Sequence, residues 1–117
     1  MLNEIVAKKK QQLQAIDQKR EIEKISEAID DLPPTRSLKR SICKDYTISI
    51  IAEIKRRSPS KGILIDNLQV DKMVKIYEEA GASAISVLTE SNYFGGSVDD
   101  LRLAKANSTL PDRKSVV

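Results

Sequence analysis

The 117 residues are enough for one modest core, and the composition of 40% hydrophobic and 32% charged residues is typical of a folded, water-soluble domain. The chain has no histidine and one cysteine, Cys43, which excludes histidine-based metal sites, histidine general bases and an internal disulfide. Residues 1–10 mix acids and bases without the apolar region of a signal peptide, and no apolar run is long enough to cross a bilayer. We therefore expect a cytoplasmic protein without a membrane partner.

The net charge of +3 includes a run of three lysines at residues 8–10, which raises the question of nucleic-acid binding. Acidic residues are interspersed with the basic ones, and the chain has only three tyrosines and one phenylalanine. Single-strand binders stack bases on aromatic side chains, and no motif of a duplex reader is present. We interpret the lysines as a solvated helix face and expect no nucleic-acid partner; a small basic nucleic-acid binder is the least favoured reading.

Residues 1–30 have helical periodicity in two sections. On a wheel that turns by about 100° per residue, one stripe consists of Leu2, Ile5, Val6, Leu13 and Ile16. A second stripe, made by Ile22, Ile25 and Ile29, lies on the opposite side of the same wheel. One straight helix would point its two apolar halves in opposite directions, so we predict two helices with a break near residues 17–20. Pro33 and Pro34 end the pattern, and a short helix is predicted at residues 37–43.

From Tyr46 the pattern changes to strands alternating with helices. Residues 46–54 and 84–88 are apolar runs rich in β-branched side chains, without polar alternation, as expected for parallel strands covered on both faces. An amphipathic helix is predicted between them and a further helix after them. This order predicts a right-handed βαβ unit in a parallel α/β fold.

The two predicted helices have recognisable ends. The first, at residues 70–80, has Asp66 or Asn67 as its N-cap and Gly81 as its stop; its inward-facing residues are Val70, Met73, Val74 and Tyr77. The second, at residues 98–106, is preceded by Ser97, and the acid three residues later resembles a capping box.

Polar residues end both predicted strands. Glu53 and Lys55 are two residues apart and so share one face of the first strand, while Thr89 and Glu90 end the second. The pair at 53 and 55 is either a structural ion pair or part of a site. In parallel α/β sheets ligands bind at the carboxyl ends of the strands, and polar residues there on two consecutive strands favour a site.

Three segments together resemble the indole-3-glycerol-phosphate synthase family: IIAEIKRRSPSKG at 50–62, AGASAISVLTESNYFGGS at 80–97, and the upstream PPTR. The resemblance extends from the helical region to about Pro111. It implies a (β/α)8 barrel with an N-terminal helical extension. Residues 1–45 would be that extension, and residues 46–117 the first two βα units with two parallel strands.

The resemblance also implies a reaction and a site. The family converts 1-(2-carboxyphenylamino)-1-deoxyribulose 5-phosphate to indole-3-glycerol phosphate in tryptophan biosynthesis, a ring closure that releases carbon dioxide and water, and it uses no metal or organic cofactor. Lys55 matches the active-site lysine and Glu53 its carboxylate partner. Ser58 and Pro59 match loop residues that line the substrate site, and Phe94 matches the aromatic that borders the anthranilate ring.

The C-terminal sequence LPDRKSVV departs from the family's third strand, which carries a lysine regarded as a general acid. Counted from Pro111 without gaps, Ser115 occupies the lysine position, and Lys114 comes one residue early and on the other face. We therefore expect the tail from Asp112 to be a frame change or a truncation. Strands three to eight would then be missing, together with the later catalytic glutamate and the phosphate site.

The expected function is therefore that of an N-terminal fragment of the synthase, inactive as the isolated chain. A non-catalytic barrel fragment, acting as an interaction or complementation module, is the alternative. The expected partners are a phosphorylated small-molecule substrate and either the missing barrel portion or another enzyme of the tryptophan pathway.

Overall fold

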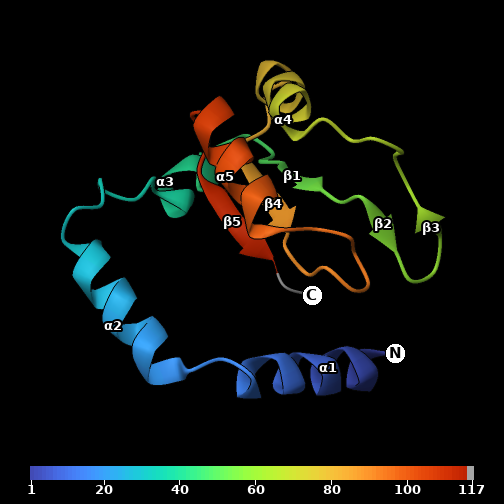
Figure 1. The fold of residues 1–117 in the computed structure, drawn as a ribbon. Coiled ribbons are helices and arrows are strands. Elements are labelled where there is room, and N and C mark those ends of the chain that lie inside the picture. The colour runs from blue at the N-terminus through green and yellow to red at the C-terminus, as the bar shows by residue number, and fades with distance from the viewer. Residues whose placement is uncertain (116–117) are drawn as a thin grey trace. The chain divides into compact units, whose positions relative to one another are not determined.

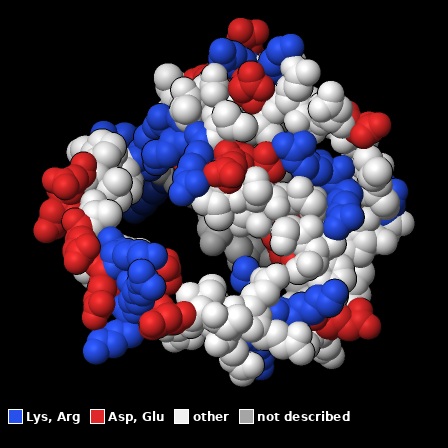
Figure 2. All heavy atoms as spheres, viewed as in Figure 1, with Lys and Arg blue, Asp and Glu red and all other residues white. Residues whose placement is uncertain are grey.

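The computed structural model describes residues 1–115 and divides the chain into two compact units, Met1–Pro34 and Thr35–Val117. The first unit holds two helices, and the second holds a parallel sheet with its covering helices (Figure 1). Within the described residues, no helix is both long and apolar enough to span a membrane. Acidic and basic side chains are interspersed over the face of the molecule shown in Figure 2.

The break predicted near residues 17–20 is confirmed. Helix α1 spans Leu2–Gln14 and α2 spans Gln18–Ile29. Asp17 between them has an extended backbone, and its carboxylate accepts a hydrogen bond of 3.2 Å from the backbone N–H of Arg20. This N-cap satisfies one of the free N–H donors at the start of α2, so α2 begins as a separate helix.

The second unit is built on a three-stranded parallel sheet in the order β1-β4-β5. Its strands are β1 (Ile51–Ile54), β4 (Ala84–Leu88) and β5 (Asp112–Ser115). Helix α4 (Val70–Glu79) connects the first two strands and α5 (Val98–Asn107) connects β4 to β5 (Figure 1). The predicted βαβ unit is confirmed, and a second one follows it.

The third strand corrects the expectation of two strands followed by a tail, a frame change or a truncation, that forms no third strand. Residues 112–115 pair in parallel with β4, and the backbone N–H of Ile85 donates to the carbonyl of Pro111 at 3.0 Å. Strand pairing uses backbone groups, which every residue here supplies, so an atypical sequence can still occupy the free edge of β4. In the register of the sheet Arg113 is opposite Ser86, and Lys114 is opposite Val87.

The first strand is shorter and more open than predicted. It begins at Ile51, because β4 begins at Ala84 directly opposite and gives the preceding residues no strand to pair with. Ile48 is 94% exposed, and Ile51 within the strand is 45% exposed, so the expectation that both faces are covered is wrong for β1. By contrast, all five residues of β4 are buried, as predicted.

The core lies between the sheet and the helices α4 and α5. It is formed by Ile54, Leu68, Val70, Val74, Ile85, Val87 and Ala104, with Met73 and Tyr77 packed against it. The cap of α4 was predicted wrongly: Gln69, not Asp66 or Asn67, precedes its first residue. Leu68 is buried in the core just before the helix, so the helical turn starts after it. Gly81, with φ of +90°, ends α4 as predicted.

The remaining elements are short. Helix α3 (Leu38–Ile42) confirms the predicted helical stretch, and the Ser37 side chain caps it by accepting from the backbone of Arg40 at 3.2 Å. Strands β2 (Arg57–Ser58) and β3 (Gly62–Ile63) form an antiparallel hairpin directly after β1. The family resemblance implied only a loop at these residues. A proline followed three residues later by glycine was the signal for a hairpin turn.

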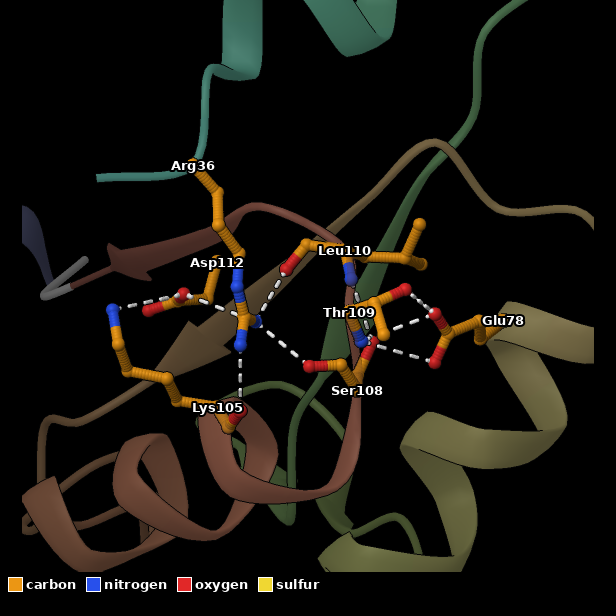
Figure 3. A network of polar contacts seen from close by, with 7 residues as sticks. All are labelled: Arg36, Glu78, Lys105, Ser108, Thr109, Leu110 and Asp112. Atoms are coloured by element: carbon orange, nitrogen blue, oxygen red, sulfur yellow. Dashed lines mark hydrogen bonds and ion pairs between the residues drawn. The ribbon is translucent and has the colours of Figure 1, made fainter. Parts of the chain in front are cut away.

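Arg36 ties the start of the second unit to the end of α5. Its guanidinium donates to three backbone carbonyls, at 2.7 Å for Ser108, 2.9 Å for Leu110 and 3.2 Å for Lys105 (Figure 3). These carbonyls lie within or just beyond the last turn of α5, where no N–H group of the helix is available to bind them. On the other side of this turn, the Glu78 carboxylate of α4 accepts from the backbone and hydroxyl of Thr109.

Candidate active site

The carboxyl end of β1 carries an acid–base pair on the face opposite the core. Ile54 points to the helices, so its neighbours Glu53 and Lys55 point the other way. The Lys55 ammonium lies 2.5 Å from a carboxylate oxygen of Glu53, with the two side chains 29% and 43% exposed. The pair is therefore formed, as the two-residue spacing predicts, and remains accessible to a ligand.

Phe94 is brought to the same place from the next strand. It lies in the loop of residues 91–96 after β4, and the Lys55 ammonium is 5.9 Å from the centre of its ring. At this distance the negative face of the ring attracts the cation. Lys55 thus lies between a carboxylate and an aromatic face, which both hold its charge in one position.

Ser58 and Pro59 are placed on the hairpin that follows β1. The Ser58 hydroxyl accepts a hydrogen bond of 3.2 Å from the backbone of Lys61 in its own turn, and Pro59 is exposed. The structure thus brings both Glu53 and Phe94 to Lys55 and leaves the other two predicted residues on an adjacent, accessible turn.

The loop that carries Phe94 is held by Glu90, which is only 4% exposed. The Glu90 carboxylate accepts from the backbone N–H groups of Asn92 at 2.9 Å, Tyr93 at 2.6 Å and Phe94 at 3.3 Å. Burial raises the pKa of this carboxyl, but the amide hydrogen bonds outweigh burial and leave its pKa below the ordinary value. Glu90 is therefore a buried anion compensated by main-chain dipoles.

Gly96 lets the same loop close against the end of β4. Its backbone N–H donates to the carbonyl of Glu90 at 2.9 Å. A Cβ at this position would lie 1.8 Å from the carbonyl oxygen of Leu88, so a larger residue would push the loop away from the strand.

Arg57 joins this loop to the hairpin. Its guanidinium donates to the carbonyls of Ser91 (3.2 Å) and Asn92, and its backbone N–H donates to the carbonyl of Phe94 at 3.3 Å. The hairpin with Ser58 and the loop with Phe94 are therefore held together by the side chain and the backbone of Arg57.

Arg56 fixes the other side of the site. It binds Asp100 of α5 through two hydrogen bonds, of 2.7 and 3.0 Å, and donates to the carbonyl of Leu68 at 3.0 Å. The hydrogen bond and the charge of Asp100 raise the pKa of Arg56 despite burial. The Asp100 side chain is thus the partner of Arg56. The predicted Ser97 cap is confirmed, because the Ser97 hydroxyl accepts a hydrogen bond of 3.1 Å from the backbone N–H of Asp100.

The sequence analysis missed Arg56, Arg57 and Asp100 as residues of this region, and named Glu90 only as a polar strand end. Arg56 and Asp100 are 44 residues apart, so no local pattern connects them. No group of three or more Cys, Asp or Glu side chains in residues 1–115 is arranged to hold a metal ion.

These features define a class. A lysine, a carboxylate and an aromatic ring meet at the carboxyl end of the first strand of consecutive βα units. The chain is thus a parallel α/β protein, a class in which ligands bind at that edge of the sheet. A comparison with family models matches residues 2–115 to indole-3-glycerol phosphate synthase. The chain belongs to the indole-3-glycerol phosphate synthase family.

Individual relatives agree with this assignment. The chain is 40% identical over 111 residues to an indole-3-glycerol phosphate synthase of Bacteroides thetaiotaomicron, covering 95% of this chain and 42% of the relative. It is 50% identical over 91 residues to one of Leptospira interrogans, covering 78% and 36%. A protein of the same name from Desulforamulus reducens is 35% identical over 111 residues, covering 95% and 42%. The chain thus spans about two fifths of the length of these curated relatives.

Proposed function

We propose that residues 46–115 supply the first strands of a (β/α)8 barrel with residues 1–45 as its helical extension. The barrel catalyses the decarboxylating ring closure of 1-(2-carboxyphenylamino)-1-deoxyribulose 5-phosphate to indole-3-glycerol phosphate in tryptophan biosynthesis. Family membership supports the reaction. The observation that carries the proposal for this chain is the Lys55 ammonium held between the Glu53 carboxylate and the Phe94 ring.

The chemistry follows from these side chains. Ring closure requires activation of the substrate ketone and a counter-charge for the carboxylate that leaves as carbon dioxide. An ammonium supplies both, and Glu53 at 2.5 Å holds the Lys55 ammonium in place. Phe94 borders the aromatic ring of the substrate, and Ser58 and Pro59 line the site from the hairpin. The proposal assigns no metal and no organic cofactor to the reaction, and a phosphorylated small molecule as its ligand.

The experiment uses a complete barrel, made of residues 1–110 of this chain joined to the remaining strands of a full-length relative. Lys55→Met should lower its kcat/KM at least about a hundredfold, or about 2.7 kcal/mol of transition-state stabilisation. Glu53→Gln should cost less but still more than about tenfold, because the lysine keeps its charge and loses its placement.

Lys72→Met, on the exposed side of α4, is the matched control and should leave turnover unchanged. Indole fluorescence follows the reaction. A folded barrel that turns over normally with Lys55→Met would leave the pair as a structural ion pair and refute the proposed role.

A second candidate function is complementation, in which this chain docks onto a separate barrel piece without catalysing the reaction alone. It is favoured by the exposed apolar residues at β1, where Ile50 is 60% and Ile51 45% exposed. Barrel closure would cover such an edge.

A further inference from the structure

The loop of residues 91–96 has an unusual support at its base. Glu90 is buried, and its carboxylate accepts hydrogen bonds from three consecutive main-chain amides, those of residues 92–94, and also from the Asn92 side chain. A buried carboxylate is costly to keep ionised unless donors surround it, and here the loop itself supplies them. The loop and the carboxylate therefore hold their conformations together.

The last of these amides belongs to Phe94, whose ring faces Lys55. The carbonyl of Glu90 also accepts from Gly96, so the residue holds the loop on both sides of Phe94. Fixing the backbone of Phe94 limits where its ring can lie, since only two side-chain torsions remain free. The position of the ring over the ammonium thus depends on the Glu90 side chain.

We infer that Glu90 is a positioning residue for the reaction: its carboxylate orders residues 92–94 so that Phe94 stays over Lys55. This inference rests on the proposed function of Lys55. The Glu90 carboxylate acts through the loop that it binds. Its loss should leave the lysine, its charge and its partner Glu53 intact, and reduce the fraction of molecules in which the cation and the ring are correctly placed.

The test combines two changes in the complete barrel. Glu90→Gln keeps the size of the side chain but replaces one acceptor oxygen with an amide donor, which faces backbone donors. We expect it to lower kcat/KM at least about tenfold. If Glu90 acts through Phe94, Glu90→Gln should not lower kcat/KM any further in a barrel that already lacks the Phe94 ring. The double variant Glu90→Gln/Phe94→Ala should then match Phe94→Ala alone within about twofold.

Two further measurements separate positioning from general stability. Hydrogen exchange of the amides of residues 92–94 should accelerate in Glu90→Gln while the amides of β4 stay protected. Glu79→Gln, an exposed glutamate at the end of α4, makes the same change of charge and should alter neither exchange nor activity. If Glu90→Gln prevents folding, Glu90→Asp keeps the buried charge at a shorter reach and serves in the same cycle.

The outcomes are distinct. Normal activity with Glu90→Gln, or losses that add fully to those of Phe94→Ala, would overturn the positioning role while Lys55→Met still abolishes turnover. If Lys55→Met itself has no effect, the proposed function fails, and exchange of the loop amides still reports whether Glu90 orders the loop.

Discussion

Two carboxylates at the ends of adjacent strands have opposite surroundings. Glu53 has a side chain that is 43% exposed and is paired with a lysine that is 29% exposed, whereas Glu90 is 4% exposed and accepts from backbone amides. An exposed pair contributes only about 0–1 kcal/mol to stability, so Glu53 and Lys55 can be replaced with little effect on folding. The buried carboxylate is part of the structure of its loop. The same residue type therefore forms an accessible ion pair on β1, for which we propose a role in the reaction, and a structural support for the loop after β4.

This difference predicts how stability depends on pH. The pKa of Glu90 is below its ordinary value of 4.5 in the folded chain, because amide hydrogen bonds outweigh burial. The ionised carboxylate therefore stabilises the fold above pH 4.5, and this contribution is lost as the pH falls through the lowered pKa. The pKa of Glu78 is also lowered, chiefly by the hydroxyl of Thr109, and acts in the same direction.

Urea unfolding of the chain and of its Glu90→Gln variant between pH 7 and pH 3 measures the effect of Glu90 alone. The variant should be less stable at pH 7, and the difference should shrink below pH 4.5 as the wild-type carboxylate becomes protonated. Because Glu78 is present in both proteins, its contribution cancels. A difference that stays constant or grows at low pH would contradict the assignment of the charged form.

Some residues of the candidate site could be predicted from the sequence, and others could not. The contact of Glu53 with Lys55 follows from the two-residue period of a strand, so it was predictable from the residues themselves. Phe94 came only from the family resemblance, since nothing local indicates that a loop 39 residues after Lys55 folds back over it. The roles of Glu90 and Arg57 depend on where loop amides and carbonyls point, which side-chain patterns do not encode.

At the scale of elements, prediction succeeded where the sequence determines an end locally. Residues 84–88 and the Ser97 cap needed no information about neighbours, because a buried apolar run and a capping hydroxyl are local signals. The start of β1 and the existence of β5 depend on what lies opposite them. Ile48 belongs to a strand-like sequence but has no partner strand and is exposed. Asp112 belongs to a sequence that is not strand-like but pairs with β4. A strand exists only where its backbone groups are paired.

Arg36 provides a prediction at this scale. Its guanidinium binds three carbonyls at and beyond the end of α5, and so fixes the turn from that helix into β5. Arg36→Met keeps much of the side chain's length but removes all donors. We expect it to lower the free energy of unfolding by about 2 kcal/mol, the usual contribution of hydrogen bonds to a charged group.

Arg102→Met is the control, because Arg102 forms an exposed ion pair of 2.8 Å with Asp99 one turn away. That change should cost no more than about 0.5 kcal/mol. Urea denaturation of the three proteins, followed by circular dichroism, gives the comparison. Equal effects of the two substitutions would mean that water hydrogen-bonds the carbonyls at the end of α5 as favourably as Arg36 does.

For the molecule as a whole, the open edge of the sheet at β1 limits the activity that we expect of the chain alone. Within the described residues the sheet has three strands, and β1 is paired on one side only. A (β/α)8 barrel needs about 250 residues, whereas the aligned part covers 42% or less of the three relatives described. Within this chain, the Lys55 ammonium is contacted by Glu53 of β1 and by Phe94 of the loop after β4. Under the proposed function, a closed barrel would have to supply the opposite wall and bind the substrate phosphate.

We predict that the 117 residues, purified alone, give no measurable ring closure. A site with one wall can hold the lysine, but it neither excludes water nor orients a flexible sugar phosphate against it, and both are needed for the rate. The measurement is indole fluorescence during incubation with the carboxyphenylamino sugar phosphate, and the complete barrel is the positive control. Turnover by the chain that disappears with Lys55→Met would show that the first strands suffice.

Adding the remaining strands as a separately produced piece should restore turnover, because the exposed edge at Ile50 and Ile51 is then covered and the second wall is present. The same mixture with Lys55→Met should stay inactive, while sedimentation should show that both pieces still associate. Association without turnover in the unsubstituted mixture would favour the non-catalytic complementation module. Turnover that requires both the second piece and Lys55 would show that this chain contributes the reacting ammonium and that barrel closure makes it effective.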